Sequence, residues 1–143
     1  MSRMGEKMLV ELLEPDPILL DDPVRPNISP VSKVNSERFV CMWLEDGKIA
    51  AVVCFAFRYG IPRNERELLQ AESNDDCGLK MILYSIWSYK KGCGSKLLFA
   101  LIKRHSWNRI ITMSPKTDMV RNFHLGNGAT VLRTNRTTVN YEY

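Results

Sequence analysis

The sequence is poor in the residues that build metal centres and membrane spans. It contains two histidines among 143 residues, and its four cysteines (41, 54, 77 and 93) include no Cys-x-x-Cys pair. Zinc sites need such ligands at close spacing, so the composition argues against a bound metal. No apolar run approaches the roughly 18 residues of a membrane span, and no signal-peptide core follows the first residues. We therefore expect a cytoplasmic protein with reduced thiols and no membrane partner.

Acidic residues are scarce in the C-terminal half. Residues 79–143 carry a net charge of +9, whereas residues 1–78 carry −5. This surplus favours an anionic ligand, although a solvated basic face or a nucleic acid would fit the same charge. No nucleic-acid motif is present, and Trp87 and Tyr89 flank a glycine turn instead of forming an exposed stacking platform. The sequence thus argues against a nucleic-acid partner.

The length and the hydrophobic content of 45% predict a single domain over residues 1–143. Five of the seven prolines lie within residues 15–30, so residues 1–38 are expected to be an irregular, proline-rich segment. Within it, the leucine spacing of Met8–Leu13 favours a helical turn over a strand. Residues 39–143 are expected to form the core.

The core sequence alternates between strand and helix patterns. Strands are expected at Phe39–Leu44, Ile49–Tyr59, 80–88, Arg109–Ser114, Thr130–Thr134 and Thr137–Tyr143, and helices at 62–70 and about 94–106. A further helix is expected to open within Ser114–Asp118, with Thr117 as its N-cap, and to end at Gly126-Asn127-Gly128. Its expected apolar face consists of Met119, Val120 and Phe123. The first two strands are joined by a turn containing Asp-Gly, which is typical of a hairpin. The strand–helix–strand–helix order that follows implies parallel strands with a right-handed crossover. The expected fold class is α/β (α+β), a mixed and mostly antiparallel sheet with central parallel strands and flanking helices.

The stretch Leu83–Leu98 carries the strongest functional signal. An apolar run ends in a turn with Gly92, Gly94 and three lysines, and an amphipathic helix starts at once. Glycines let a ligand approach the backbone, and the amide groups at a helix start attract phosphates. A P-loop would need glycine at 89 and a dinucleotide fingerprint would need it at 97, but these positions are Tyr and Leu.

The turn resembles the signature Gln/Arg-x-x-Gly-x-Gly/Ala of the GNAT superfamily of N-acetyltransferases. Residues 89–94 match it except at Tyr89, where Gln or Arg is usual. A second stretch, Phe123–Ala129, is similar to the family's Leu-Tyr-Glu-Lys-x-Gly-Phe, with His124 in place of Tyr, and Thr117 stands where many members carry Asn. The two motifs occur in the family's order. Compatible strands extend the resemblance to Phe39–Tyr143.

The resemblance implies a GNAT-like acyl-CoA N-acyltransferase fold, with acetyl-CoA as co-substrate and direct attack by an amine on the thioester. The cofactor-binding residues that it implies are Tyr84, Ile86, Tyr89, Lys90, Lys91, Gly92, Cys93, Gly94, Ser95, Lys96 and Thr117. Tyr84 and Ile86 would act through their backbone. His124 is the candidate general acid for the leaving thiolate, and the alternative is a surface histidine near a helix end. Neither a base nor a metal ligand is identified, so removal of the amine proton is left to a water relay or to a Glu or Asp carboxylate within residues 45–76.

The acceptor is expected to be a small-molecule or peptide amine. The resemblance places it near residues 15–30 and 60–78, and the second segment carries acidic groups that would attract a cation: Glu65, Glu67, Glu72, Asp75 and Asp76. The departures at Tyr89, Thr117 and His124 keep a second function open, a degenerate member that binds acyl-CoA without catalysis. A basic nucleic-acid-binding module is a third interpretation, and a homodimer is left open.

Overall fold

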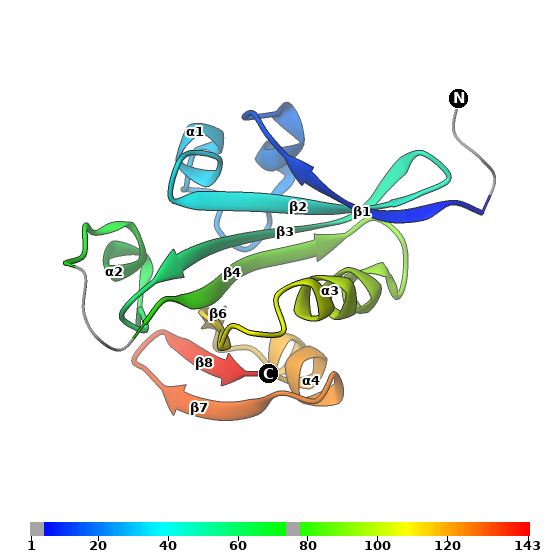
Figure 1. Cartoon of the computed structure of the whole chain (residues 1–143). Coiled ribbons are helices and arrows are strands. Elements are labelled where there is room, and N and C mark those ends of the chain that lie inside the picture. Colours follow the sequence, from blue (N-terminus) through cyan, green and yellow to red (C-terminus); the bar gives the residue numbers. More distant parts are fainter. Residues whose placement is uncertain (1–4, 74–77) are drawn as a thin grey trace. The chain divides into compact units, whose positions relative to one another are not determined.

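The computed structural model describes residues 5–73 and 78–143 (Figure 1). Within these residues the strands form one eight-stranded sheet in the order β1-β2-β3-β4-β5-β8-β6, and β7 pairs with β8. Strands β4 and β5 are parallel, whereas β1–β2, β5–β8, β6–β8 and β7–β8 are antiparallel. A mixed, mostly antiparallel sheet with flanking helices confirms the expected fold class.

Most elements of residues 39–143 lie close to their predicted positions. The strands are β1 (Lys7–Leu12), β2 (Arg38–Glu45), β3 (Lys48–Arg58), β4 (Lys80–Ser88), β5 (Ile110–Thr112), β6 (Ser114–Pro115), β7 (Thr130–Thr134) and β8 (Thr138–Glu142). The helices are η1 (Pro17–Asp21, a 3-10 helix), α1 (Pro30–Lys33), α2 (Glu65–Leu69), α3 (Cys93–Arg104) and α4 (Asp118–Gly126).

The chain groups into two compact units. The first unit comprises Met1–Phe55 and Ser85–Ser106, and the second comprises Ala56–Tyr84 and Trp107–Tyr143. Strands β3 and β4 each contribute residues to both units.

In the first unit, the expectation of a helical turn at Met8–Leu13 is wrong. Residues Lys7–Leu12 form β1, which pairs antiparallel with β2 in a register that places Leu9 opposite Trp43. The leucine spacing of so short a segment fits a helical turn and a strand equally well. The hydrogen-bonding edge offered by β2, which the local sequence does not contain, decides between them.

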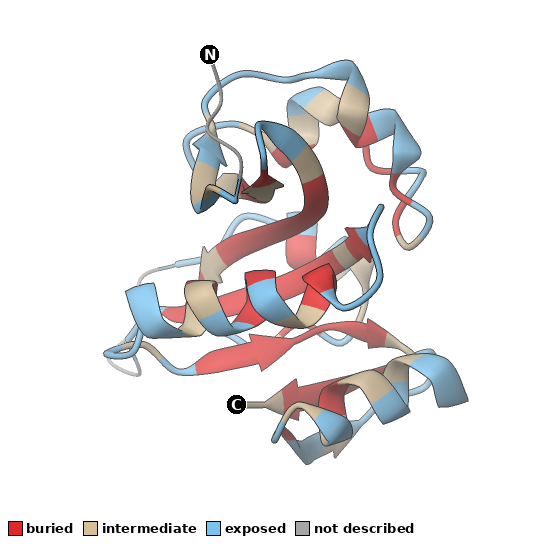
Figure 2. Ribbon diagram, turned by 90° about the vertical axis from the view of Figure 1, so that its right-hand side faces the viewer, coloured by how far each residue is buried: buried red, intermediate tan, exposed pale blue. Residues whose placement is uncertain are grey.

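The hairpin between β2 and β3 turns as predicted. Asp46 and Gly47 have φ values of 54° and 77°, the pair of left-handed conformations that a tight two-residue turn requires. The core of this unit packs β-branched residues of β2 and β3 with leucines of α3, and all of the following are fully buried: Val40, Val52, Val53, Leu97, Leu98 and Leu101. Figure 2 shows buried residues concentrated in the strands, whereas the longer helices alternate buried and exposed residues.

The proline-rich segment contains a buried ion pair. Lys33 is 0% exposed, and its Nζ lies 2.9 Å from Oδ2 of Asp22 and donates to the carbonyl of Arg25 at 3.0 Å. The other Asp22 oxygen accepts from the backbone amides of Val24 and Arg25. These contacts link η1 to α1 in a segment whose prolines interrupt regular hydrogen bonding.

In the second unit, β4 and β5 pair in parallel as predicted, with Met81 opposite Ile110. This register stops at Leu83, one residue before Tyr84. The expected strand Arg109–Ser114 is divided, because β5 ends at Thr112 and β6 then pairs with β8 instead of β4.

Helix α4 begins where it was predicted but buries a different face. Thr117 is its N-cap, and its hydroxyl accepts from the amide of Val120 at 3.3 Å. Met119, expected on the apolar face, is 79% exposed, and His124 is the buried residue of the helix. The expected helix at 62–70 is also shorter, since Asn64 caps it and it starts at Glu65.

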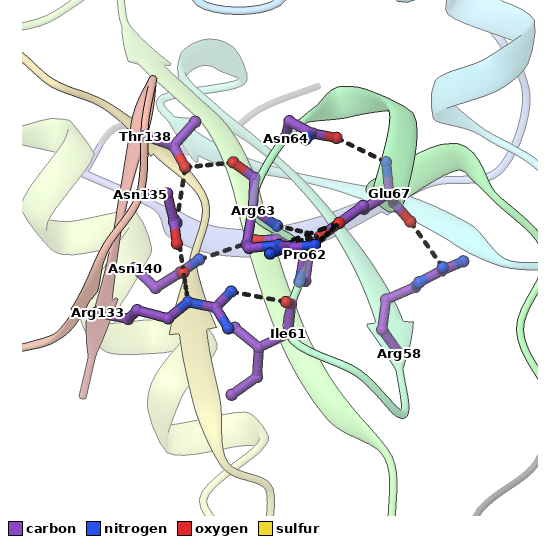
Figure 3. A network of polar contacts seen from close by, with 10 residues as sticks. All are labelled: Arg58, Ile61, Pro62, Arg63, Asn64, Glu67, Arg133, Asn135, Thr138 and Asn140. Atoms are coloured by element: carbon purple, nitrogen blue, oxygen red, sulfur yellow. Dashed lines mark hydrogen bonds and ion pairs between the residues drawn. The ribbon is translucent and has the colours of Figure 1, made fainter.

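A polar network anchors the segment before α2 to the C-terminal hairpin (Figure 3). Asn140 is 0% exposed, and its amide donates to the carbonyls of Pro62 at 3.1 Å and Thr112 at 2.7 Å. Arg133 donates to the carbonyl of Ile61, and the hydroxyl of Thr138 donates to that of Arg63. Residues 61–63 are thus held by side chains of β7 and β8 in place of strand pairing.

Candidate functional site

The predicted anion-binding turn has the expected strand–loop–helix geometry in the first unit. Strand β4 ends at Ser88 and α3 begins at Cys93, with Gly92 as N-cap at φ 82° and ψ −10°. A Cβ added at Gly92 would meet no atom within 4 Å, so this glycine is required by its left-handed backbone and not by crowding. The cap makes no side-chain hydrogen bond to the helix. The amides at the start of α3 therefore have no side-chain cap, as an anion site needs.

Two of the three loop lysines bind the same carboxylate. Glu45, the last residue of β2, is 6% exposed, and its Oε1 lies 2.7 Å from Nζ of Lys90 while its Oε2 lies 3.2 Å from Nζ of Lys96. The indole of Trp43 donates to Oε2 at 3.0 Å. These partners, Lys90 first, hold the pKa of Glu45 well below its usual range. The contact of Glu45 with the loop was not predicted from the sequence, because nothing in the hairpin pattern indicates that the end of β2 meets the loop.

Lys91 is the third lysine of the turn. It is exposed, and within residues 5–73 and 78–143 it forms no ion pair. The loop therefore combines one lysine that faces solvent with two that share a counter-charge.

Tyr89, which departs from the family signature, ties the loop to the proline-rich segment. Its hydroxyl donates to Oδ2 of Asp21 at 2.6 Å and accepts from the indole of Trp87 at 3.0 Å. Burial and the neighbouring Asp21 raise the pKa of Tyr89. The side chain is 47% exposed, so one face of the ring still lies at the surface.

The remaining loop residues offer backbone, not reactive side chains. Cys93 is 0% exposed, and burial followed by the charge of Glu45 raises the pKa of its thiol. A protonated, buried thiol is a poor nucleophile, which agrees with a backbone role for this position. Gly94 is buried in the first turn of α3, whereas Ser95 and Ile86 are partly exposed.

The other predicted site residues, Tyr84, Thr117 and His124, belong to the second unit. Tyr84 is 1% exposed in β4. The side chain of Thr117 caps α4, so its hydroxyl is already used by the helix.

His124 lies in a buried chain of hydrogen bonds. Its Nε2 is 3.2 Å from Oγ of Ser114, and its Nδ1 is 2.5 Å from the hydroxyl of Tyr143. Ser114 donates to Oγ1 of Thr112 at 2.7 Å. With the serine proton so used, Nε2–H donates to Ser114 and Nδ1 accepts from Tyr143, which is the arrangement of a neutral imidazole.

The environment of His124 disfavours its charged form. The residue is 3% exposed, and burial lowers its pKa to about 4. The interpretation as a surface histidine is therefore wrong. At neutral pH the ring carries one proton, which is engaged with Ser114, so the structure supplies no imidazolium to act as a ready acid.

Two carboxylates of the acidic connection before β4, those of Glu67 and Glu72, bind groups of the protein itself. Glu67 accepts from the Arg63 side chain, with its Oε2 2.6 Å from Nη2, and its pKa is lowered to about 2, chiefly by Arg63. Glu72 accepts from the amides of Tyr59 and Gly60 at 2.8 and 2.7 Å. Asp75 and Asp76, also predicted to attract the acceptor, lie outside the described residues.

A pocket of about 200 Å³ lies in the same part of the second unit. Its lining combines charged side chains with the backbone turn after β3: Arg58, Gly60, Ile61, Pro62, Glu67, Gln70 and Glu72. Arg58 contacts Glu72, with 3.3 Å between Nε and Oε1, and donates to the carbonyl of Glu67. The pocket is polar, and its charged side chains have partners: Arg58 pairs with Glu72, and Glu67 pairs with Arg63.

Among the described residues, no group of three or more His, Cys, Asp or Glu side chains is placed to hold a metal ion. No helix in that part of the chain is long and apolar enough to cross a membrane.

Comparison with known proteins identifies solved structures that share this fold. No protein-family model matches the chain, and a search of curated proteins found no match. Among solved structures, an acetyltransferase assigned to the GNAT family from Desulfovibrio desulfuricans aligns with a TM-score of 0.61 and 13% identity, over 96% of this chain and 98% of that one. An N-acetyl transferase from E. coli bound to coenzyme A aligns with a TM-score of 0.59 and 14% identity, over 96% and 99%.

A third structure, malonyl-CoA decarboxylase from Agrobacterium vitis, aligns with a TM-score of 0.73 and 13% identity over 96% of this chain. This chain spans 60% of the length of that enzyme. At such identities the shared property is the fold. The comparisons thus show that the chain has the fold of the GNAT N-acetyltransferases.

Proposed function

We propose that this protein is an acetyl-CoA-dependent N-acetyltransferase. The observation that supports it best is the turn from β4 into α3, where a left-handed Gly92 forms the N-cap of the helix and Lys90, Lys91 and Lys96 lie around it in the sequence. The turn occurs in a fold shared with a protein bound to coenzyme A. A diphosphate matches the charge and the amides of this turn.

The residues of the turn fit such a ligand. Space is open around Gly92, and the side chains of Lys90 and Lys96 are 61% and 45% exposed, so their ammonium groups reach solvent while contacting Glu45. By the family resemblance, Tyr84 and Ile86 would contact the pantetheine arm through their backbone; both lie in β4, the strand that leads into the turn.

In the proposed reaction the amine nitrogen attacks the thioester carbonyl. A carbon–nitrogen bond forms, the carbon–sulfur bond breaks, and one proton passes from the amine to a base while the thiolate takes up another. His124 is the proposed proton donor. Because its pKa is about 4, the ring is neutral at neutral pH, so release of the Nε2 proton requires Nδ1 to take up the proton of the Tyr143 hydroxyl, which solvent then replaces.

A second candidate function is acyl-CoA binding without transfer. It is favoured by the burial and the neutral state of His124. A buried neutral histidine with both ring nitrogens hydrogen-bonded can be a structural element of α4 and β8. Release of free CoA from acetyl-CoA in the presence of a panel of small-molecule and peptide amines separates the two. Release that depends on an amine supports the enzyme, and tight binding with no release over the panel supports the binding protein.

The binding site itself is tested by Gly92→Ala, with Gly128→Ala as a matched control. Both glycines have a left-handed φ, 82° and 95°, and at both an added Cβ would meet no atom within 4 Å. Each substitution should therefore cost a similar backbone strain, about 1–2 kcal/mol. Only Gly92→Ala should weaken acetyl-CoA binding in calorimetry, by about tenfold. Equal affinities in the two folded variants would remove the turn from the site.

A further inference from the structure

The carboxylate of Glu45, which contacts the loop lysines, has no role in the family signature. Glu45 accepts from three donors on three different segments: Trp43 on β2, Lys90 in the loop and Lys96 in α3. Its side chain is 5% exposed, whereas the side chains of Lys90 and Lys96 are 61% and 45% exposed. The anion is therefore buried and its two cations face outward.

We propose that Glu45 is a built-in counter-anion that competes with the phosphates of the ligand for Lys90 and Lys96, and so sets the affinity of the loop. This inference rests on the proposed acyl-CoA function. It assigns to Glu45 the regulation of that site and not a part in the chemistry.

The competition arises from charge. Without Glu45, the two ammonium groups would present two positive charges to a diphosphate, and with Glu45 the three groups sum to one. A phosphate that contacts either ammonium lies a few ångströms from the carboxylate, because the nitrogen–oxygen distances are 2.7 and 3.2 Å. Like charges at such separations repel measurably even in a water-like medium.

Hydrogen bonding does not remove this competition. An ammonium group has three donors, so each lysine can contact Glu45 and a phosphate at the same time. The carboxylate thus keeps the lysines in place while it weakens their field. Anchoring and competition act in opposite directions on affinity, and an isosteric substitution separates them.

Glu45→Gln keeps an oxygen that accepts from Trp43 or a lysine and removes the charge. We expect it to bind acetyl-CoA about threefold to tenfold more tightly than the wild type at about 20 mM NaCl, and the gain to shrink at about 300 mM NaCl. Glu11→Gln is the matched control. Glu11 is an exposed β1 residue paired in register with Cys41, four positions from Glu45, so it removes the same charge away from the loop.

The measurement is calorimetry with acetyl-CoA and, separately, with inorganic diphosphate, on all three proteins. Tighter binding of either probe by Glu45→Gln but not by Glu11→Gln supports the proposal. The gain should vanish when Lys90 and Lys96 are both replaced by Met.

Unchanged or weaker binding by a folded Glu45→Gln overturns the counter-anion role and leaves acyl-CoA binding intact, since the wild type still binds. Binding of diphosphate but not of acetyl-CoA overturns the proposed function and leaves the counter-anion role standing. Binding of neither probe by any variant overturns both.

Discussion

The burial of His124 makes the stability of the protein depend on pH in a calculable way. The side chain is 3% exposed and its pKa is lowered to about 4 from the ordinary value of 6.5. Replacing it by Gln removes the titrating group while keeping a polar side chain that can contact Ser114. The perturbation therefore tests the neutral state of the ring and not only its packing.

The sign follows from proton binding. Because the folded pKa lies below the unfolded one, the unfolded chain binds more protons between about pH 4 and pH 6.5, and folding stability falls as pH is lowered through this window. The contribution of His124 is fully present above the unfolded pKa. With a folded pKa of about 4, the wild type should lose about 1 kcal/mol between pH 7 and pH 5.5, and about 2 kcal/mol between pH 7 and pH 4.5, from this residue alone.

Urea unfolding of the wild type and of His124→Gln at about pH 7, 5.5 and 4.5 measures this contribution. The lowered pKa values of Glu67 and Glu142 also remove stability as pH falls, but they do so in both proteins. The difference between the two pH slopes therefore isolates His124. The variant is expected to be less stable at pH 7 and to lose less on acidification.

His105 provides the control. Its pKa is also lowered, by burial first, but it lies at the end of α3 and is partly exposed. His105→Gln should change the slope less than His124→Gln does. Parallel pH profiles for the wild type and His124→Gln would refute the reasoning, because they would show that the ring is charged, or free to become charged, in the folded protein.

Two further predictions concern buried polar groups. Lys33→Met should lower the free energy of unfolding by about 3–5 kcal/mol, because Asp22 would stay buried without its counter-charge; a loss below about 1 kcal/mol in urea unfolding would show that the pair is solvated. Asn140→Asp should cost about 2–3 kcal/mol, since the amide that donates to Pro62 and Thr112 would be replaced by a carboxylate oxygen facing two carbonyls. Thermal unfolding checks it, and an unchanged midpoint would contradict the role of this network.

The sequence alone predicted most of the order of secondary-structure elements and the likeness to the GNAT fold. The hairpin at Asp46-Gly47 and the cap at Thr117 follow from backbone preferences of single residues, so they could be read without knowledge of distant contacts. The same holds for the Gly92 turn, where a left-handed glycine joins an apolar strand to an amphipathic helix. In each case the physical cause lies within a few residues of its effect.

The tertiary structure decided the features whose cause is distant in sequence. Lys7–Leu12 became a strand because β2 offered a partner, and β5 ended early because β8 pairs with β6. His124 could have lain on the surface or in the core from its helix position alone. Its burial depends on Ser114 and Tyr143, which lie 10 and 19 residues away.

The charge of the loop shows most clearly the difference between what neighbouring residues determine and what distant residues determine. Three lysines around two glycines predicted a strongly positive turn. Glu45 neutralises part of that charge from 45 and 51 residues away, and no local pattern connects it to Lys90 and Lys96. Local propensities are read from neighbouring residues, whereas Coulomb interactions depend on distance in space, and folding brings together charges that the sequence keeps apart.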